Sequence, residues 1–328
     1  MWSLLESMDG TRTVDQIVTR VGDLHPAASA DSVRAGLDRL VGSGYIEDAG
    51  APDPAVLTDR DKERYSRSRR FFRWLDLIPR ANSWEPQLAL RAARVTVVGV
   101  GGTGGHAAQA LAASGVGRLH CVDHDVVELS NLNRQILYCE DDIGASKVET
   151  AVSRLRRLNS DIEITGAELR IEGVSDLARL AADCDVLVLA ADRPPEIRAW
   201  TNRACLAEGT PWVHSGYHGP LVTVGTFVPG IGACWECLQE SDDERHRAMG
   251  TNPADADAPY RRAALANAVC APSAGLCGNL AAHAALALLT GVPRWPVGEI
   301  HAINLVAIGE HLVVDDARRP GCQACGKT

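Results

Sequence analysis

Short apolar runs alternate with helical segments from residue 94 onward. The first run, 95–98, leads into a glycine-rich turn, and the second, 118–122, ends at Asp123. Further short runs occur at 162–164 and 185–189, and helical patterns occupy 106–114, 146–158 and 194–207. Strands that alternate with helices predict a parallel sheet covered on both faces.

The pattern changes again beyond residue 210. Apolar positions at Val213 and over 221–228 predict later strands of an antiparallel portion. The segment 238–258 is polar and acidic and predicts a mobile loop. The fold class expected is α/β, a Rossmann-like, mostly parallel sheet.

The first 50 residues form a separate pattern of three short helices. Asp9-Gly10 predicts a turn, Asp31 caps the third helix, and Tyr45–Glu47 begins a strand. The apolar positions at helical spacing are Leu4, Leu5, Met8, Val14, Ile17, Val18, Val21, Val33, Leu37, Leu40 and Val41. We therefore expect a winged-helix-like module at 1–50, a linker and helix at 51–92, and the sheet domain at 93–328.

The glycine turn carries the first candidate chemistry. Its glycines follow a strand and open a helix, at Gly99, Gly101, Gly102 and Gly104. Backbone N–H groups at such a helix start bind phosphate, and a carboxylate ending the next strand binds ribose. Asp123 stands there, 24 residues after Gly99. A nucleotide site is predicted, with a purely structural turn as the alternative; the GxxxxGK[ST] pattern of Walker-type ATPases is lacking.

Composition and charge limit the class of protein and its expected location. The 328 residues are 46% hydrophobic and 23% charged, typical of a soluble globular protein. The net charge of −9 disfavours nucleic-acid binding. No apolar run reaches the roughly 18 residues that cross a membrane, and the start lacks a signal-peptide pattern. We expect a cytoplasmic protein with reduced thiols, which neither spans a membrane nor binds nucleic acid.

Ten cysteines then need an explanation. Two CxxC pairs, Cys234/Cys237 and Cys322/Cys325, lie 84 residues apart and predict one tetrahedral Zn²⁺ with four thiolate ligands. Such a site is closed and structural. Cys121, Cys184 and Cys205 fall in strand or helix patterns and read as core, and we also expect Cys270 and Cys277 to be buried at the Ala/Leu-rich helix. Cys139 has no assignment.

Several ordered motifs resemble one family. After Asp123 come Ser130-Asn131-Leu132-Asn133-Arg134-Gln135, then Asp142-Ile-Gly-Ala-Ser-Lys147, then Asp192, then the two CxxC pairs. With these, 60–328 resembles the ThiF/MoeB family of ATP-dependent adenylating enzymes, relatives of the ubiquitin-activating enzymes. The resemblance implies an adenylation domain with ATP, Mg²⁺ and Zn²⁺ as cofactors.

The resemblance also implies residue roles. Arg134 and Lys147 would neutralise charge on the phosphates, Asp123 would hold the ribose, and Asp192 would handle Mg²⁺. The nucleotide-binding set is Gly99, Gly101, Gly102, Gly104, Asp123, Asp125, Asn131, Asn133, Arg134, Gln135, Lys147 and Asp192. Taken singly, Arg134 and Lys147 also read as surface ion pairs, and Asp192 as a helix cap.

The segment before the sheet domain resembles a family element that acts across a dimer. In Arg64-Tyr65-Ser66-Arg67, the last arginine would enter the ATP site of the other subunit as a catalytic arginine finger in trans, which implies a homodimer. Residues 1–48 resemble the helical half of PqqD-like peptide-recognition domains, whose preceding strands this chain lacks. The alternative is a winged-helix remnant that only aids dimerisation.

Two departures from the family bear on the chemistry. Arg193 stands after Asp192 where relatives often have asparagine, and 238–269 lacks the cysteine with which some relatives bind their carrier covalently. The expected reaction is therefore adenylation of a carboxylate on a peptide or small carrier protein, in ribosomal peptide natural-product maturation. Alternatives are a sulfur-carrier adenylyltransferase, a non-enzymatic leader-docking protein for a partner modifying enzyme, and an NAD-dependent oxidoreductase.

Overall fold

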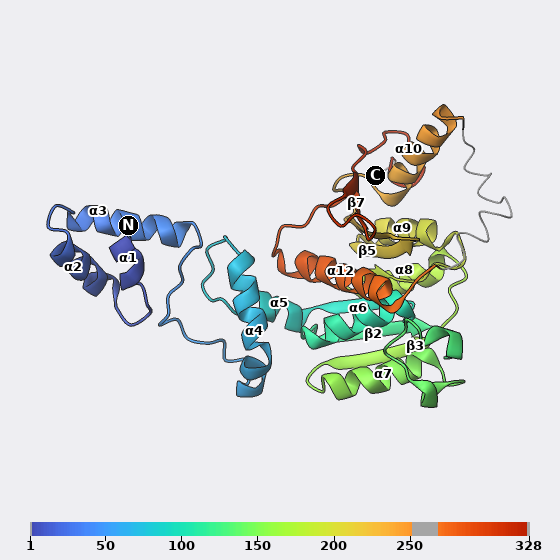
Figure 1. Cartoon of the computed structure of the whole chain (residues 1–328), viewed down its shortest axis with the longest axis horizontal. Helices are drawn as coiled ribbons and strands as arrows, with labels where there is room; N and C mark the ends of the chain where they lie inside the picture. Colours follow the sequence, from blue (N-terminus) through green and yellow to red (C-terminus); the bar gives the residue numbers. More distant parts are fainter. Residues whose placement is uncertain (1, 251–267, 327–328) are drawn as a thin grey trace. The chain divides into compact units, whose positions relative to one another are not determined.

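The computed structural model describes residues 2–250 and 268–326. The chain separates into two compact units, Met1–Leu88 and Ala89–Thr328 (Figure 1). The second unit contains the sheet and both groups of residues singled out from the sequence, the glycine turn and the CxxC pairs.

Three helices open the first unit: α1 (Trp2–Ser7), α2 (Val14–Leu24) and α3 (Ala30–Gly42). Their apolar faces meet in one small core of Leu4, Ile17, Val18, Val21, Val33 and Leu37. The predicted strand at Tyr45–Glu47 is wrong, because no strand occurs in the described part of this unit. Tyr45 N–H instead closes the end of α3 by donating to Leu40 O, and a strand needs a partner to satisfy its backbone.

Two further helices begin in the same unit. Helix α4 (Asp59–Leu75) starts at a capping box, in which Thr58 and Asp61 bond each other's backbone N–H groups. It buries Tyr65 and Phe72, and the Arg69 guanidinium lies 4.9 Å above the Trp84 ring. Helix α5 (Glu85–Ala92) continues into the second unit.

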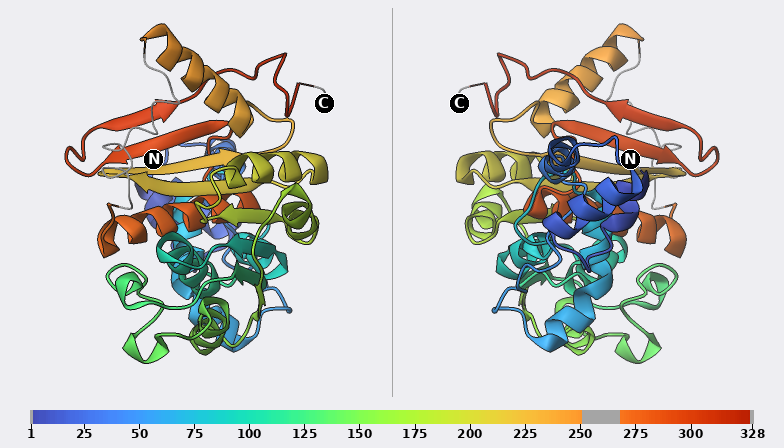
Figure 2. Two further views of the ribbon diagram at one scale, coloured as in Figure 1. Left: turned by 90° about the vertical axis from the view of Figure 1, so that its right-hand side faces the viewer. Right: turned by 90° about the vertical axis from the view of Figure 1, so that its left-hand side faces the viewer.

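An eight-stranded sheet forms the second unit, in the order β3-β2-β1-β4-β5-β6-β7-β8. The strands are β1 (Arg94–Val98), β2 (Arg118–Asp123), β3 (Glu163–Glu168), β4 (Val186–Leu189), β5 (Trp212–His218), β6 (Leu221–Phe227), β7 (Glu299–Asn304) and β8 (His311–Val314). The first five are parallel, and β6 to β8 add antiparallel strands. The predicted α/β class with a mostly parallel sheet is confirmed. Figure 2 shows strands of this sheet lying side by side across the unit.

The helices of this unit form two groups, distinguished by which helices pack together. Helix α6 (Gly102–Ala113) packs against α7 (Lys147–Leu158) and α12 (Ala271–Thr290), whereas α8 (Val174–Ala182) packs against α9 (Ile197–Glu208) (Figure 1). Because β1 and β4 are neighbours while α6 and α9 follow them in different groups, their carboxyl ends lie at a switch point where ligands bind in open α/β sheets.

Close contact between α6 and α12 depends on one glycine. A Cβ at Gly278 would lie 2.3 Å from Thr103 O and 2.9 Å from Ala107 N, both backbone atoms. Helix α12 is long and apolar enough to cross a membrane by length and composition, yet 61% of its apolar window is buried inside this unit. It is a core helix that fixes the position of α6.

The segment predicted as a mobile loop, 238–258, is in part helical. Helix α10 (Trp235–Ala248) covers its first part, which corrects the prediction, and 251–258 lies outside the described residues. The polar sequence forms a helix because ion pairs satisfy its charged side chains. Arg245 pairs with Asp242 on the helix and with Asp316 in the C-terminal segment.

Candidate functional site

The glycine turn joins β1 to α6 and lies against the end of β4. Gly99 has φ +87°, a backbone conformation that favours glycine, and a Cβ there would lie 2.8 Å from Ala191 N. A Cβ at Gly104 would lie 1.7 Å from Gly99 O. Gly101 caps α6 without a side-chain hydrogen bond, so the first N–H groups of the helix remain available to an anion.

Asp123 ties the end of β2 to this turn. Its Oδ2 accepts a hydrogen bond from Val100 N at 2.8 Å, and its Oδ1 accepts one from Asp125 N at 2.9 Å. Each carboxylate oxygen has a further lone pair for a hydroxyl donor. Asp123 thus both fixes the turn and offers acceptors where the sequence predicts a ribose.

Lys147 begins α7 beside the same strand end. Its side chain is buried, and Nζ lies 3.0 Å from Asp125 Oδ2. Burial by itself raises the pKa of the Asp125 carboxyl, but the Lys147 ammonium, together with His124 and Arg170, outweighs it and the net pKa is lowered. The structure therefore brings Asp123, Asp125 and Lys147 to one point at the carboxyl end of β2.

Three more predicted nucleotide-binding residues, Asn131, Arg134 and Gln135, lie around the 3₁₀ turns η1 (Leu129–Asn131) and η2 (Glu140–Asp142). Buried Asn131 accepts from Glu128 N at 3.2 Å and so holds its own turn. Arg134 Nη1 donates to Ser130 O and to Asn133 Oδ1, both at 2.9 Å. Gln135 is buried next to Gly101, and its Oε1 has no hydrogen-bond partner among the described residues.

Arg134 also lies against the glycine turn and a residue that the sequence did not indicate. A Cβ at Gly102 would lie 3.5 Å from Arg134 Cγ. Burial raises the pKa of the Tyr217 phenol, the Arg134 guanidinium opposes this shift, and the Asp192 carboxylate adds to it. Tyr217 near the end of β5 is therefore close to both charged groups. Nothing in the apolar pattern of β5 distinguishes it, because the contact depends on strand order.

Asp192 follows β4 and is exposed, adjoining Ala190 and Ala191, which contact the glycine turn. Together with Arg134, Lys147 and Asp123 it belongs to the carboxyl-end edge of β1, β2 and β4. Arg67 belongs to the first unit, where it is exposed on α4. Of the predicted nucleotide-binding residues, the structure joins Asp123, Asp125 and Lys147 at the end of β2 and places Arg134 and Gln135 against the glycine turn.

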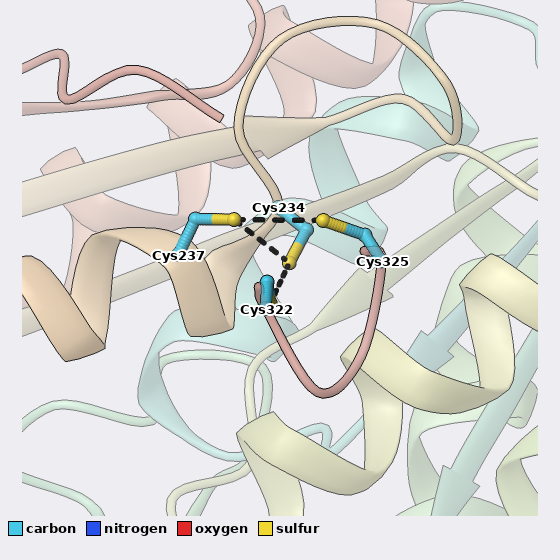
Figure 3. A group of neighbouring side chains, drawn as sticks. All are labelled: Cys234, Cys237, Cys322 and Cys325. Carbon is cyan, nitrogen blue, oxygen red and sulfur yellow. Dashed lines mark hydrogen bonds between the residues drawn. The ribbon is translucent and has the colours of Figure 1, made fainter. Parts of the chain in front are cut away.

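The two CxxC pairs meet as predicted (Figure 3). The Sγ atoms of Cys234, Cys237, Cys322 and Cys325 all lie within 4.8 Å of one another, and three of the separations are 3.7, 3.7 and 3.5 Å. A disulfide would need about 2.05 Å. Four thiolates about 2.3 Å from a tetrahedral Zn²⁺ are about 3.8 Å apart, so the buried cluster fits a closed zinc site.

Polar groups surround the four cysteines, and two of them contact sulfur. Asn202 Nδ2 lies 3.5 Å from Cys234 Sγ, and Arg319 N donates to Cys237 Sγ at 3.4 Å. Glu236, between the first pair, is held by Arg203 at 3.0 Å. N–H donors aimed at sulfur stabilise thiolates and orient metal ligands.

The other cysteines divide into two classes. Cys121, Cys184, Cys205 and Cys277 are buried, as predicted. Cys270 is exposed, which corrects the prediction: it is the N-cap of α12, a position at the helix surface, where its N–H donates to Ser273 Oγ at 3.1 Å. Exposed Cys139, unassigned from sequence, lies 2.8 Å from an Arg154 terminal nitrogen.

With this geometry in place, comparison with known proteins decides the family. The model of the ThiF family matches residues 72–324. The chain belongs to the ThiF family. Within it, the molybdopterin-synthase adenylyltransferase of Escherichia coli is 32% identical over 83% of this chain and 100% of its own length. The sulfur carrier protein ThiS adenylyltransferase of the same organism is 33% identical over 82% of this chain and 97% of its own.

A third ThiF relative matches more strongly over a shorter region. The SAMP-activating enzyme E1 of Haloferax volcanii is 44% identical over 154 residues, 47% of this chain and 56% of that protein. These relatives place the chain in an ATP-using family of adenylyltransferases.

Solved structures show that the fold is shared over nearly the whole chain. E. coli MccB, crystallised with AMPCPP and MccA, superposes with a TM-score of 0.78 at 23% identity, covering 99% of this chain and 90% of that one. PaaA superposes with a TM-score of 0.71 at 22% identity, covering 96% and 89%. At these identities the likeness shows the fold.

Proposed function

We propose that this ThiF-family enzyme adenylates a carboxylate on a peptide or small carrier protein, in the maturation of a ribosomal peptide natural product. A carboxylate oxygen attacks the α-phosphorus of ATP, the bond from that phosphorus to the α–β bridging oxygen breaks, and pyrophosphate leaves. The gathering of Asp123, Lys147, Arg134 and Asp192 around the glycine turn carries this proposal.

Each group has a task that its position supports. Attack on phosphorus adds negative charge, which the buried Lys147 ammonium and the Arg134 guanidinium counter in a site of reduced dielectric. Asp123 accepts from the ribose, and the exposed N–H groups at the start of α6 bind phosphate. Asp192 offers the carboxylate oxygens that Mg²⁺ prefers, and Mg²⁺ bound there supplies further charge neutralisation on the phosphates.

The peptide assignment rests on the N-terminal unit. MccB is described as a microcin C7 biosynthetic enzyme in complex with N-formylated MccA, and its chain is similar to 99% of this one, so the likeness includes the N-terminal helices. We propose that residues 1–50 form a peptide-recognition module, 51–92 a linker with the arginine-finger helix, and 93–328 the adenylation domain.

A sulfur-carrier adenylyltransferase is the second candidate. The observation that favours it is the match to two adenylyltransferases of E. coli over 97–100% of their length. Both candidates share the same adenylation step and differ in the acceptor: a short peptide in one case and a folded carrier protein in the other. A docking protein for a partner modifying enzyme would not need the charged groups at this edge.

We further propose a cytoplasmic homodimer in which Arg67 serves the partner's ATP site, and one structural Zn²⁺ per chain at the four-cysteine cluster. The cluster lies at the start of α10 and in the C-terminal segment, and it includes none of the residues assigned to ATP. Zinc with four thiolates has no open position, so its role there is to stabilise the fold.

ATP–pyrophosphate exchange tests the proposal. Radiolabelled pyrophosphate should enter ATP only when a suitable C-terminal carboxylate is present, and short peptides and folded carrier proteins should be compared. Asp192→Asn should abolish exchange while the protein stays folded, and Arg179→Gln, at an exposed position of α8, should leave exchange unchanged. Exchange by Asp192→Asn at the native rate would contradict the assignment.

A further inference from the structure

A second arginine, Arg198, follows Asp192 in the chain, and its side chain donates a hydrogen bond to a histidine. Arg198 belongs to the first turn of α9, six residues after Asp192, and most of its side chain is covered. Its Nε donates to Nε2 of His214 on β5 at 2.7 Å. His214 is buried, in a T-shaped contact with Trp212 at a ring separation of 6.5 Å.

The partner of this arginine is neutral. Burial, reinforced by the Arg198 charge, lowers the pKa of His214 to about 3. Because Nε2 accepts from Arg198, the ring proton is on Nδ1, which is buried and has no partner among the described residues. Imidazole therefore fixes the direction of the guanidinium without cancelling its charge.

The terminal amino groups of Arg198 remain unused. Within the residues that the structure describes, its side chain makes the one hydrogen bond to His214 and has no carboxylate within 4.0 Å. Asp192 acts on it only over a longer range, opposing the lowering of the Arg198 pKa that burial causes. A covered cation without a counterion is costly, and the cost is recovered when an anion binds.

We propose that Arg198 is an oxyanion-binding residue of this site, positioned by His214, and that it binds a carboxylate or phosphate oxygen of the reactants opposite Arg134. A planar guanidinium matches either group with two parallel hydrogen bonds. Asp192 would then stand between two arginines, one on the α6 side of the sheet edge and one at the start of α9. This role rests on the proposed adenylation, although pyrophosphate binding tests it without turnover.

Calorimetry on the full chain supplies the first arm, with inorganic pyrophosphate and with a non-hydrolysable ATP analogue. Arg198→Lys keeps the charge and loses the planar fork, so affinity for a phosphate ligand should fall at least tenfold. Arg179→Gln is the control, an exposed arginine paired with Asp176 on α8. The second arm is the KM of the peptide that gives pyrophosphate exchange.

The two measurements show whether Arg198 binds an oxygen of the phosphates or of the substrate carboxylate. Weaker pyrophosphate binding assigns Arg198 to phosphate, and a raised peptide KM with unchanged pyrophosphate binding assigns it to the substrate carboxylate. No change in either arm overturns the proposal. If no carboxylate supports exchange, the proposed function fails, and pyrophosphate binding alone then decides for or against the subsite.

His214 is tested by replacements that differ in their acceptor. In His214→Gln the amide oxygen can accept from Arg198 Nε, so ligand affinity should be close to native. In His214→Met the acceptor is lost, and affinity should fall as in Arg198→Lys. Equal affinities of Gln and Met variants, both folded by circular dichroism, would remove the positioning role. Arg198→Lys changes a partly exposed side chain and remains decisive if His214→Met does not fold.

Discussion

Lys147 Nζ lies 3.0 Å from Asp125 Oδ2, and Lys147 N donates to Asp125 O at the same distance. Asp125 thus binds both the backbone N–H of Lys147, which starts α7, and the ammonium group of the same lysine. Replacing Lys147 by Met should lower the adenylation rate by about 100-fold or more, the usual effect of losing a charge that stabilises a transition state.

The matched variant is Asp125→Asn, which keeps the shape and leaves the ammonium without its counterion. We expect a smaller loss than in Lys147→Met, since Lys147 remains present but less well positioned. Single-turnover formation of the acyl adenylate measures both. Equal rates for native protein and Lys147→Met would show that the ammonium takes no part in the chemistry.

The cysteine cluster predicts an effect on stability that is separable from the chemistry. Cys322→Ser removes one ligand of a link between positions 88 residues apart, Cys234 and Cys322. Closing a loop of this length is worth about 4.6 kcal/mol in the chain-entropy model, so the free energy of unfolding should fall by up to a comparable amount. Urea unfolding measures the loss and elemental analysis the metal, with one zinc per chain expected in native protein. Buried Cys205→Ser, outside the cluster, should retain the zinc.

His214 predicts a pH dependence of stability. Its pKa is about 3 when folded against an ordinary 6.5, so the unfolded chain binds a proton between these values and the folded chain does not. Stability from this group is complete above pH 6.5 and is lost as pH falls, by up to about 1.4 kcal/mol per unit. His214→Gln should remove this slope. Urea unfolding of both proteins between pH 7.5 and 5 gives the difference, in which other acid effects cancel; parallel curves would contradict the prediction.

Packing of α12 against α6, the helix that carries the glycine turn, predicts a combined loss of stability and ATP binding. In Gly278→Ala the new methyl group meets backbone atoms of α6 at 2.3 and 2.9 Å, so α6 and α12 must separate. We expect a loss of about 1–3 kcal/mol and weaker ATP binding, because α6 carries the turn. Gly275→Ala is the control on the same helix: its methyl lies 3.2 Å from the end of the His106 side chain, which can move.

Mixed dimers test the arginine finger. Arg67→Ala alone should dimerise and fail to adenylate, as should Asp192→Asn alone. Mixing the two should restore activity to about a quarter of native, because only the mixed dimer, half of a random mixture, has one site with both residues. Absence of restored activity in a mixture shown to contain mixed dimers would contradict action in trans.

Local patterns were sufficient for the sheet edge around Asp123. A strand, a tight turn, a helix and a second strand follow each other within 30 residues, and each has its own signal of burial or chain reversal. The cysteine cluster was also predictable, because thiolate chemistry limits what two reduced CxxC pairs do. The roles proposed for Arg134, Lys147 and Asp192 come from the resemblance to the family, not from local pattern.

Contacts between distant segments were not predictable in this way. Tyr217 and His214 reach the site because β5 lies next to β4, and strand order leaves no mark in the sequence of either strand. Helix α10 was missed because it is stabilised by the Arg245–Asp316 pair with the C-terminal segment, 71 residues away. The exposure of Cys270 follows from its place as a cap, whereas its neighbours in sequence suggested a core position.

If the four-cysteine cluster holds the proposed Zn²⁺, it closes the last third of the chain into a ring. With the proposed Zn²⁺ bound, segments on both sides of a cut are joined through sulfur and metal, so a backbone cut at the exposed Val306–Ile308 turn between β7 and β8 would release no fragment. The last 20 residues would stay bound through Cys322 and Cys325 as well as through the β8 edge. A nicked protein should therefore migrate as one particle until a chelator is added, and only then lose its tail.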